Sequence, residues 1–176
     1  GTNTLLVSSS PHVHSGATVR RIMLDVVIAL LPAFAAACWM FGWHAVRLVT
    51  VCVGGCVLLE YVSRRLMKRD SGIGDWSAVL TGILLAFNLP PGFESWKALV
   101  GCVFAIVIAK QLYGGIGMNP FNPALIGRVA LVASFPVSMT RWTAWRVPSP
   151  LHMDAVTQAT PLGLVKTSVG AGEPIP

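Results

Sequence analysis

Charged residues are scarce in this chain of 176 residues, at 11%, whereas hydrophobic residues make up 54% and the mean hydropathy is +0.68. A soluble domain carries about 25% charged residues. The chain therefore has too few polar side chains to cover the surface of a soluble globule of this length. This shortage excludes a soluble domain and indicates that lipid surrounds most of the surface, so we expect an all-α integral membrane protein.

The placement of basic residues and cysteines argues against nucleic-acid and metal sites. The net charge is +6, but the basic residues form short clusters between apolar runs instead of one basic face, which excludes nucleic acid as a partner. All four cysteines lie inside apolar stretches, without a CxxC pair or a histidine cluster. We therefore expect neither a metal site nor a disulfide framework.

Five apolar runs follow one another along the chain, at residues 22–43, 45–62, 76–89, 96–113 and 123–135. A helix needs about 20 residues to cross the hydrocarbon. The third and fifth runs have only about 14 and are bounded by glycine and proline, as broken helices beside an internal cavity are. The alternative is that they complete a span with flanking residues. We expect about five transmembrane or half-membrane helices.

The distribution of lysine and arginine predicts the orientation of these helices. Arg20 and Arg21 precede the first run and four basic residues follow the second, whereas the loop at 42–44 has none. We therefore predict a cytoplasmic N-terminal segment (1–21), a membrane domain (22–136) and an extracytoplasmic tail (137–176). Trp39, Trp43, Trp96, Trp142 and Trp145 all fall at the predicted outer interface, where tryptophan is enriched.

Single polar residues within or between the runs have two interpretations each. Arg128 is either a functional intramembrane charge or a side chain that reaches the inner interface. Asp25, Glu60 and Lys110 are expected at the inner interface, although any of them could line an ion path. The glycine-rich stretch 114–117 is not a dinucleotide fingerprint, because it lacks GxGxxG. It is either a close backbone turn, with Asn119 and Asn122 capping the fifth helix, or a plain tight loop.

The tail carries the residues on which the functional prediction depends. Asp154 stands six residues before Thr160, Thr157 stands three before it, and Ala159 directly precedes it. On the pattern alone, this is a solvated loop with a helix cap. The segment also resembles the flavinylation motif Asp-x-x-Ser/Thr-Gly-Ala-Thr, whose last threonine carries FMN through a phosphoester bond, with Gln158 in place of the glycine.

Further segments, at residues 9–12, 18–26, 75–91, 114–124 and 127–129, agree with the tail in their order along the chain. Together they resemble the RnfD/NqrB family, the membrane subunits of the Rnf electron-transport complex and of its relative, the sodium-pumping NADH:quinone oxidoreductase. The resemblance implies one half of an inverted-repeat fold in the bacterial inner membrane. It also implies a subunit of an ion-translocating ferredoxin:NAD oxidoreductase complex that relays electrons through FMN on Thr160.

The same resemblance implies the cofactors and partners. FMN would be covalent, and riboflavin is left open as a further cofactor. The expected partners are the other subunits of the complex, the lipid membrane and an FMN transferase, for which Asp154 would be a recognition or metal-proximal group. No catalytic residue is expected in this chain. Whether it counts as an enzyme stays open, because it would act as one subunit of a redox-driven translocase.

Two other functions stay open: a channel or transport protein of urea-channel-like fold, which the short third and fifth runs would suit, and a structural membrane subunit with Thr160 unmodified. The spacing of Asp154 and Thr160 favours the redox subunit. Residues 15–18 also read Ser-Gly-Ala-Thr. His12 stands there in place of the acid and the segment is predicted cytoplasmic, so Thr18 is not expected to carry flavin.

The predicted orientation can be tested with reporters fused after Pro176. A reporter that works only in the periplasm should be active there, because five crossings from a cytoplasmic N-terminus place the tail outside. A matched reporter that works only in the cytoplasm should be silent. The reverse pattern would contradict the orientation and the compartment of the flavin site.

Overall fold

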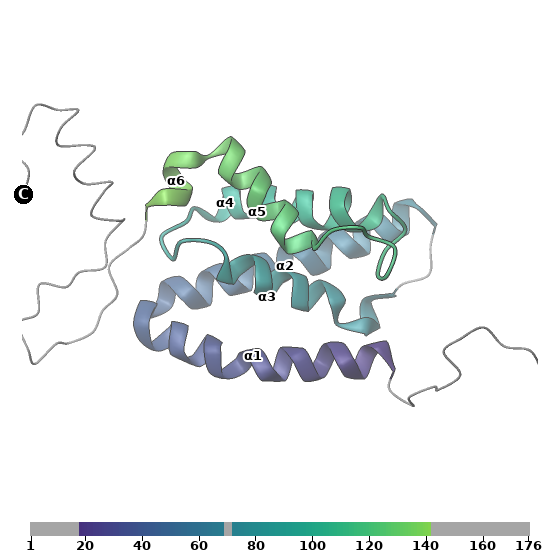
Figure 1. Cartoon of the computed structure of the whole chain (residues 1–176), viewed down its shortest axis with the longest axis horizontal. Helices are drawn as coiled ribbons and strands as arrows, with labels where there is room; N and C mark the ends of the chain where they lie inside the picture. Colours follow the sequence, from purple (N-terminus) through teal and green to yellow (C-terminus); the bar gives the residue numbers. More distant parts are fainter. Residues whose placement is uncertain (1–17, 69–71, 142–176) are drawn as a thin grey trace, which may run out of the picture.

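The computed structural model describes residues 18–68 and 72–141, and all secondary structure in these ranges is helical (Figure 1). The elements are α1 (Val19–Phe41), α2 (Trp43–Leu66), the 3-10 helix η1 (Gly72–Asp75), α3 (Ser77–Phe87), α4 (Ser95–Val103), the π-helix η2 (Phe104–Gln111), α5 (Pro123–Ser134) and α6 (Pro136–Thr140). The prediction of an all-α chain is confirmed for the described part.

Each of the five predicted apolar runs coincides with a helical element, and the fourth run divides into α4 and η2. Among the helices of the described residues, only α1, with 23 residues, and α2, with 24, are long and apolar enough to cross a membrane by themselves. None of the residues of α1 is buried. This exposure of an apolar helix supports a membrane location, whereas the number of helices that cross stays a prediction.

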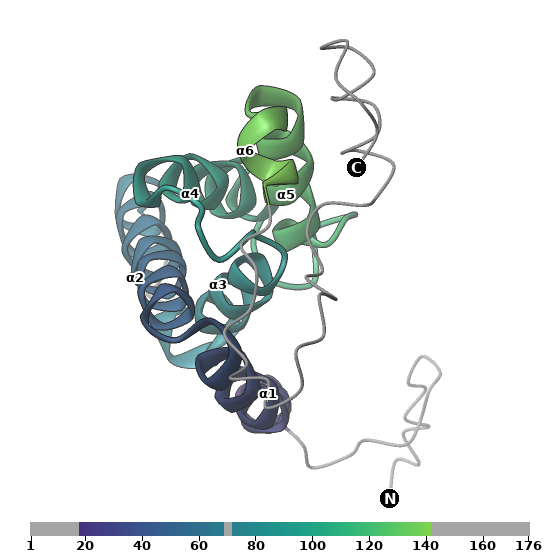
Figure 2. The same ribbon diagram turned by 90° about the vertical axis from the view of Figure 1, so that its left-hand side faces the viewer.

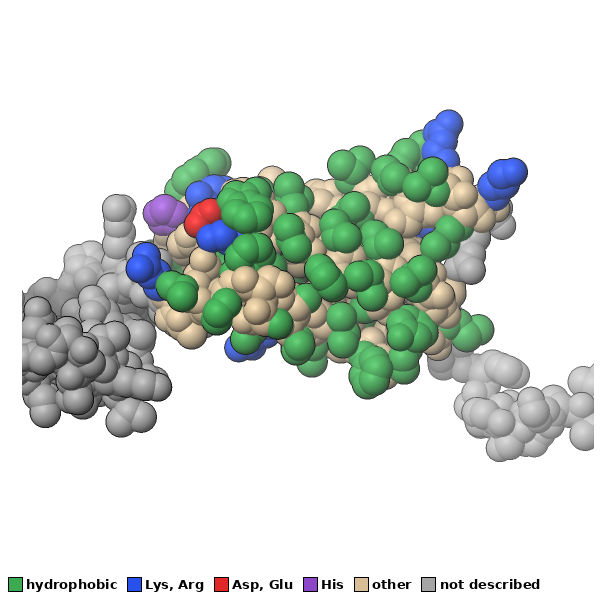
Figure 3. Space-filling model, turned by 90° about the horizontal axis from the view of Figure 1, so that it is seen from above, with side chains coloured by type: hydrophobic (Ala, Val, Ile, Leu, Met, Phe, Trp, Pro, Cys, Tyr) green, Lys and Arg blue, Asp and Glu red, His purple; other side chains and the backbone are tan. Residues whose placement is uncertain are grey.

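Side-chain chemistry is distributed as a membrane protein requires. Hydrophobic side chains spread across the middle of one face, and charged ones gather towards its two ends (Figure 3). Trp39 at the end of α1, Trp43 at the start of α2 and Trp96 at the start of α4 are all exposed. These three helix ends lie at the same end of the bundle (Figure 1), as expected for an aromatic belt.

Helix ends follow from local sequence. The Thr18 hydroxyl caps α1 by accepting from the Arg21 N–H at 3.3 Å, and the Asn122 side chain caps α5 by accepting from the Ala124 N–H at 3.0 Å. Asn119 is not a cap, since its amide donates to the Phe121 carbonyl at 2.8 Å. The stretch 114–117 is a close turn whose glycines 114, 115 and 117 have φ between +83° and +112°, which favours glycine.

In the end-on view, α3 lies between α1 on one side and α5 on the other, with α2 and α4 along the remaining side (Figure 2). The backbones of α2 and α3 approach closely, since a Cβ on Gly82 would lie 2.6 Å from the Cα of Val53. Small residues at helix interfaces let backbones approach in membranes, where the hydrophobic effect does not drive association. Gly82 therefore determines how closely the central helix packs.

Helix α3 extends only partway along the bundle, and the chain that connects it to α4 is not helical (Figure 1). Leu89, Pro90 and Phe93 in this segment are buried, and Arg47 Nη2 of α2 donates to the Phe93 carbonyl at 2.9 Å. Irregular backbone at membrane depth is tolerated where protein buries it and satisfies its polar groups. In the structure the third run forms α3, which ends at Phe87 and continues as this buried irregular segment, and whether the run crosses a membrane stays a prediction.

Replacing Gly82 by alanine should destabilise the chain, because the new methyl group meets the backbone of α2, which cannot move aside. Overpacking of this kind costs about 1–3 kcal/mol. Gly54→Ala is the matched control, since nothing lies within 4 Å of a Cβ at Gly54. Thermal unfolding in detergent should show a lower midpoint for the first variant alone, and equal midpoints would contradict this packing.

Candidate functional site

Buried charges meet where α2, α3 and η2 converge. Glu60 is 0% and Lys110 is 2% exposed, and Lys110 Nζ donates to Glu60 Oε2 at 2.8 Å and to Ser77 Oγ at 2.6 Å. Gln111 Nε2 and Arg64 Nε both donate to Glu60 Oε1, each at 3.1 Å. Both carboxylate oxygens of Glu60 and the ammonium group of Lys110 therefore have hydrogen-bond partners, as a buried ion pair requires.

The cluster closes into a ring through Asp75. The Asp75 Oδ1 atom accepts from the Ser77 hydroxyl at 2.6 Å, and the Asp75 Oδ2 atom lies 3.9 Å from Arg64 Nη2. Two carboxylates, Glu60 and Asp75, thus face two cations, Lys110 and Arg64. The charges balance within this inner network, which we define as Glu60, Arg64, Asp75, Ser77, Lys110 and Gln111.

The π-helix explains how neighbouring residues reach the same acid. The Leu112 N–H donates to the Val107 carbonyl at 3.1 Å, and the Gly115 N–H to the Lys110 carbonyl at 3.0 Å, both five residues back. This wider turn leaves the consecutive Lys110 and Gln111 both buried and both bonded to Glu60. Such π segments are rare and frequently occur at functional sites.

The sequence predicts Glu60 and Lys110 at the inner interface. The structure shows that both are buried in protein, and their depth in a membrane stays a prediction. The two residues are 50 positions apart, so neither hydropathy nor charge spacing could reveal the pair. One feature of the sequence did point to the pair. Glu60 and Lys110 both stand among apolar residues, near helix ends that the predicted topology places on the same side of the membrane.

A cavity of about 440 Å³ adjoins the inner network between α1, α3 and the chain leading into α5. Lys110 and Ser77 belong to both the network and the cavity wall, and the other polar lining residues are Thr81, Asn119 and Asn122. Its volume and its mixture of apolar walls with a few polar groups are typical of small-molecule sites.

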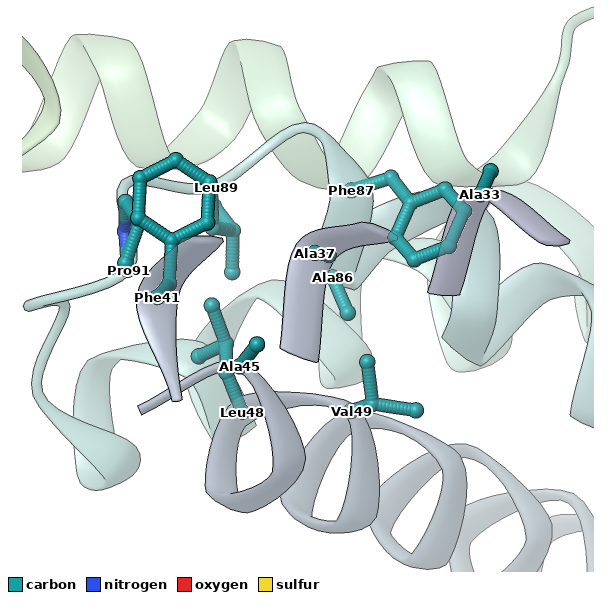
Figure 4. A pocket seen from close by; sticks show the side chains of 10 residues that line it. All are labelled: Ala33, Ala37, Phe41, Ala45, Leu48, Val49, Ala86, Phe87, Leu89 and Pro91. Carbon is teal, nitrogen blue, oxygen red and sulfur yellow. The ribbon is translucent and has the colours of Figure 1, made fainter. Parts of the chain in front are cut away.

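A second cavity, of about 250 Å³, has a different character (Figure 4). It lies between α1, α2, α3 and the segment after α3. Its lining side chains are all apolar, and they are Ala33, Ala37, Phe41, Ala45, Leu48, Val49, Ala86, Phe87, Leu89 and Pro91. With no donor, acceptor or charge to orient a reacting group, this cavity is not a candidate for chemistry.

The break at the end of α3 carries a polar pair. Arg128 Nη1 of α5 donates to the Asn88 side-chain oxygen at 2.7 Å, and the Asn88 amide donates to the Leu84 carbonyl at 2.8 Å. Asn88 directly follows α3, so the guanidinium lies at the negative end of that helix dipole. The Arg128 guanidinium is therefore directed to the C-terminal end of α3.

At the opposite end, Lys97 joins α4 to the chain around α6. Lys97 Nζ donates to Glu94 Oε1 at 2.6 Å and to Ser138 Oγ at 2.8 Å, and it lies 5.4 Å from the centre of the Phe135 ring. Hydrogen bonds from Lys97 and from Trp96 hold the pKa of Glu94 below its ordinary value. This contact holds α6, where the predicted tail (137–176) begins, against α4.

The predicted flavinylation residues Asp154, Thr157, Ala159 and Thr160 lie outside the described residues, so the motif stays a prediction. Thr18 is described, and its hydroxyl caps α1. That structural role accounts for the threonine without a flavin. Three of the cysteines, Cys52, Cys56 and Cys102, are buried in the core between α2 and α4.

Removing one partner of the buried ion pair should destabilise the chain strongly. Glu60→Gln or Lys110→Met alone leaves an uncompensated buried charge, which costs about 3–5 kcal/mol. The double variant removes both charges, so its loss in thermal unfolding should be clearly smaller than the sum of the two single losses. Additive losses would contradict a direct pairing of these side chains.

Comparison with known proteins agrees with this architecture. The sequence model of the NQR2, RnfD, RnfE family matches residues 6–175. The subunit designated D of the Na(+)-translocating ferredoxin:NAD(+) oxidoreductase complex of Acetobacterium woodii is 51% identical over 162 residues, which cover 92% of this chain and 49% of that protein.

The subunit designated D of the ion-translocating oxidoreductase complex of Salmonella newport (strain SL254) is 41% identical over 96% of this chain and 56% of its own length. The protein of the same name from Salmonella paratyphi B is 40% identical with the same coverage. The chain thus spans about half the length of the curated relatives that it matches. On the family match and these identities, the chain belongs to the NQR2, RnfD, RnfE family.

Proposed function

We propose that this chain is a redox subunit of an ion-translocating ferredoxin:NAD oxidoreductase complex of the Rnf type, with FMN attached covalently to Thr160. The observation that carries the proposal is the spacing of Asp154, Thr157, Ala159 and Thr160 in the tail of a chain that belongs to this family. The names of its relatives support the type of complex.

The chemistry of the tail fits a phosphoester. The Thr160 hydroxyl would form the new bond to the phosphorus of the FMN part of FAD, while the pyrophosphate bond breaks and AMP leaves. A threonine hydroxyl is a poor nucleophile at neutral pH and needs a base or metal beside it. An FMN transferase with Mg²⁺ would supply these and accept the proton. Positioning and charge neutralisation dominate such transfers, so Asp154 has a recognition or metal-proximal role.

A covalent flavin suits electron relay because it cannot diffuse away and, when bound, accepts and passes single electrons. The contact of Lys97 with Ser138 contributes by holding α6, where the predicted tail begins, against α4. We propose that the tail lies outside the cytoplasm of a bacterial inner membrane. The other subunits of the complex would then supply and remove the electrons.

Riboflavin, as a further and noncovalent cofactor, is proposed for the cavity beside the inner network. Its 440 Å³ volume suits a small planar ligand, and its wall offers Lys110, Asn119 and Thr81 for polar contacts. The Asn119 amide already donates to the Phe121 carbonyl, which leaves its side-chain oxygen as an acceptor. Flavin released by denaturation would report this site, whereas the Thr160 flavin would remain on the chain.

A channel or transport protein of urea-channel-like fold is the second candidate, because α3 is a short helix of 11 residues next to a cavity. A structural subunit with an unmodified tail is the third. In-gel fluorescence of the denatured chain separates the first candidate from both, because only covalent flavin survives denaturation.

Replacing Thr160 by valine should abolish covalent flavin, because a phosphoester needs a hydroxyl at the attacked position. Thr160→Ser keeps the hydroxyl and should retain labelling. Asp154→Asn should lower labelling without moving it, and Thr157→Ala should have a smaller effect. The measurement is peptide mass mapping of the 147–166 fragment after coexpression with an FMN transferase.

Thr18→Ala is the matched control, since it alters the competing Ser-Gly-Ala-Thr sequence and should leave labelling unchanged. Flavin mass that persists in the Thr160→Val chain, or maps to Thr157 or Thr18, would show that the motif is wrongly assigned. An unlabelled wild-type chain beside a labelled positive control would favour the structural subunit.

A further inference from the structure

An unpartnered stripe on α5 combines apolar side chains with a single charge. Leu125, Arg128 and Val132 follow one another at three and four residues, the spacing at which side chains share one face of a helix. Leu125 is 48% and Val132 is 45% exposed, and Arg128 is exposed as well. The residues that pack α5 onto the bundle form a separate buried face, consisting of Ala124, Gly127 and Leu131.

The charge of Arg128 is not balanced within residues 18–68 and 72–141. Its one bond there is to the neutral oxygen of Asn88, although a guanidinium has five donors to satisfy. The four acidic residues of these ranges are Asp25, Glu60, Asp75 and Glu94. The last three are bonded to other side chains, and Asp25 is an exposed residue of α1, which lies on the far side of α3 from α5 (Figure 2).

An unpaired arginine in a membrane protein can keep its charge in water by extending to the membrane surface. The position of the Arg128 guanidinium excludes this arrangement. Arg128 Nη1 is held at 2.7 Å by Asn88, and Asn88 follows the last residue of α3. That end of α3 lies a full 11-residue helix away from Asp75 and the inner network. The guanidinium therefore lies on the surface of the bundle, partway along its length, where an arginine inside a membrane is costly without an anionic partner.

We propose that this stripe is a helix-packing interface, and that its partner is a further apolar membrane helix with an aspartate or glutamate that accepts from Arg128. The three- and four-residue spacing is that of a helix seam, into which the side chains of a second helix fit. A carboxylate is the complementary group, because it can accept two parallel bonds from a guanidinium.

A lipid phosphate matches this site less well than a helix. Phosphates lie in the headgroup layer, whereas Asn88 holds the guanidinium at the break of α3. An apolar helix also covers Leu125 and Val132 while it carries its acid to the depth of Arg128. Relatives of this chain have about as much sequence again outside the matched part, since the chain covers 49% and 56% of two of them. Such sequence is one source of the helix.

Photo-crosslinking in intact membranes that contain the native complex tests the interface directly. A benzophenone amino acid at Leu125 or Val132 should crosslink to a peptide from an apolar segment that includes an aspartate or glutamate. Ile28 is the matched control, because it is 52% exposed and belongs to α1, which lies on the far side of α3 from α5 (Figure 2). A benzophenone at Ile28 should not label the same peptide.

Charge reversal tests the ion pair. Arg128→Glu should lower the crosslinking yield at Leu125 by about tenfold or more, since like charges would then face each other. Changing the acid of the crosslinked helix to arginine should restore the yield, and Arg128→Lys should retain most of it.

The proposal is overturned if the Leu125 and Val132 probes label only lipid, only a second copy of this chain, or a helix without an acid. It is also overturned if Arg128→Glu leaves the yield unchanged. Crosslinking in the chain with native Arg128 decides the matter even where a charge variant fails to fold. None of these outcomes depends on flavin attachment.

Discussion

The hydrocarbon of a membrane offers no hydrogen-bond partner, so each polar group inside it must be satisfied by the protein. This constraint explains the main polar features of the described residues. Glu60 and Lys110 are buried as a pair, with Arg64 and Gln111 on the same carboxylate. The irregular segment after α3 is buried as well, and Arg47 satisfies the Phe93 carbonyl within it.

The same constraint explains why apolar and polar side chains lie in different regions along the bundle. Apart from polar groups such as Arg128 and Asn88, the middle of the described bundle is mainly apolar, and one cavity has an entirely apolar lining (Figure 4). Two further polar groupings lie towards the ends: the inner network with its adjoining cavity, and Lys97 with Glu94 at the other end. The proposed attachment of a flavin to a threonine in the tail agrees with this division, because the redox group would not have to be built into the helices.

Much of the architecture was predictable because glycine and proline mark its boundaries. The apolar run at 123–135 became α5 (Pro123–Ser134), with Asn122 as its cap, and the run at 76–89 became α3 (Ser77–Phe87). Periodicity reports the neighbours of a residue along the chain, not its contacts across the bundle. It therefore could not pair Glu60 with Lys110, direct Arg128 to Asn88, or reveal the π-helix that turns both Lys110 and Gln111 to one acid. Asp154 and Thr160 are known from their spacing and the resemblance alone.

The intact mass of the purified chain, coexpressed with an FMN transferase and denatured before measurement, tests the central claim most directly. Our account predicts one main species, heavier than the polypeptide by one FMN group less the water lost in forming the phosphoester. A chain at its unmodified mass, beside a known flavinylated protein that is labelled in the same cells, would contradict a covalent redox subunit.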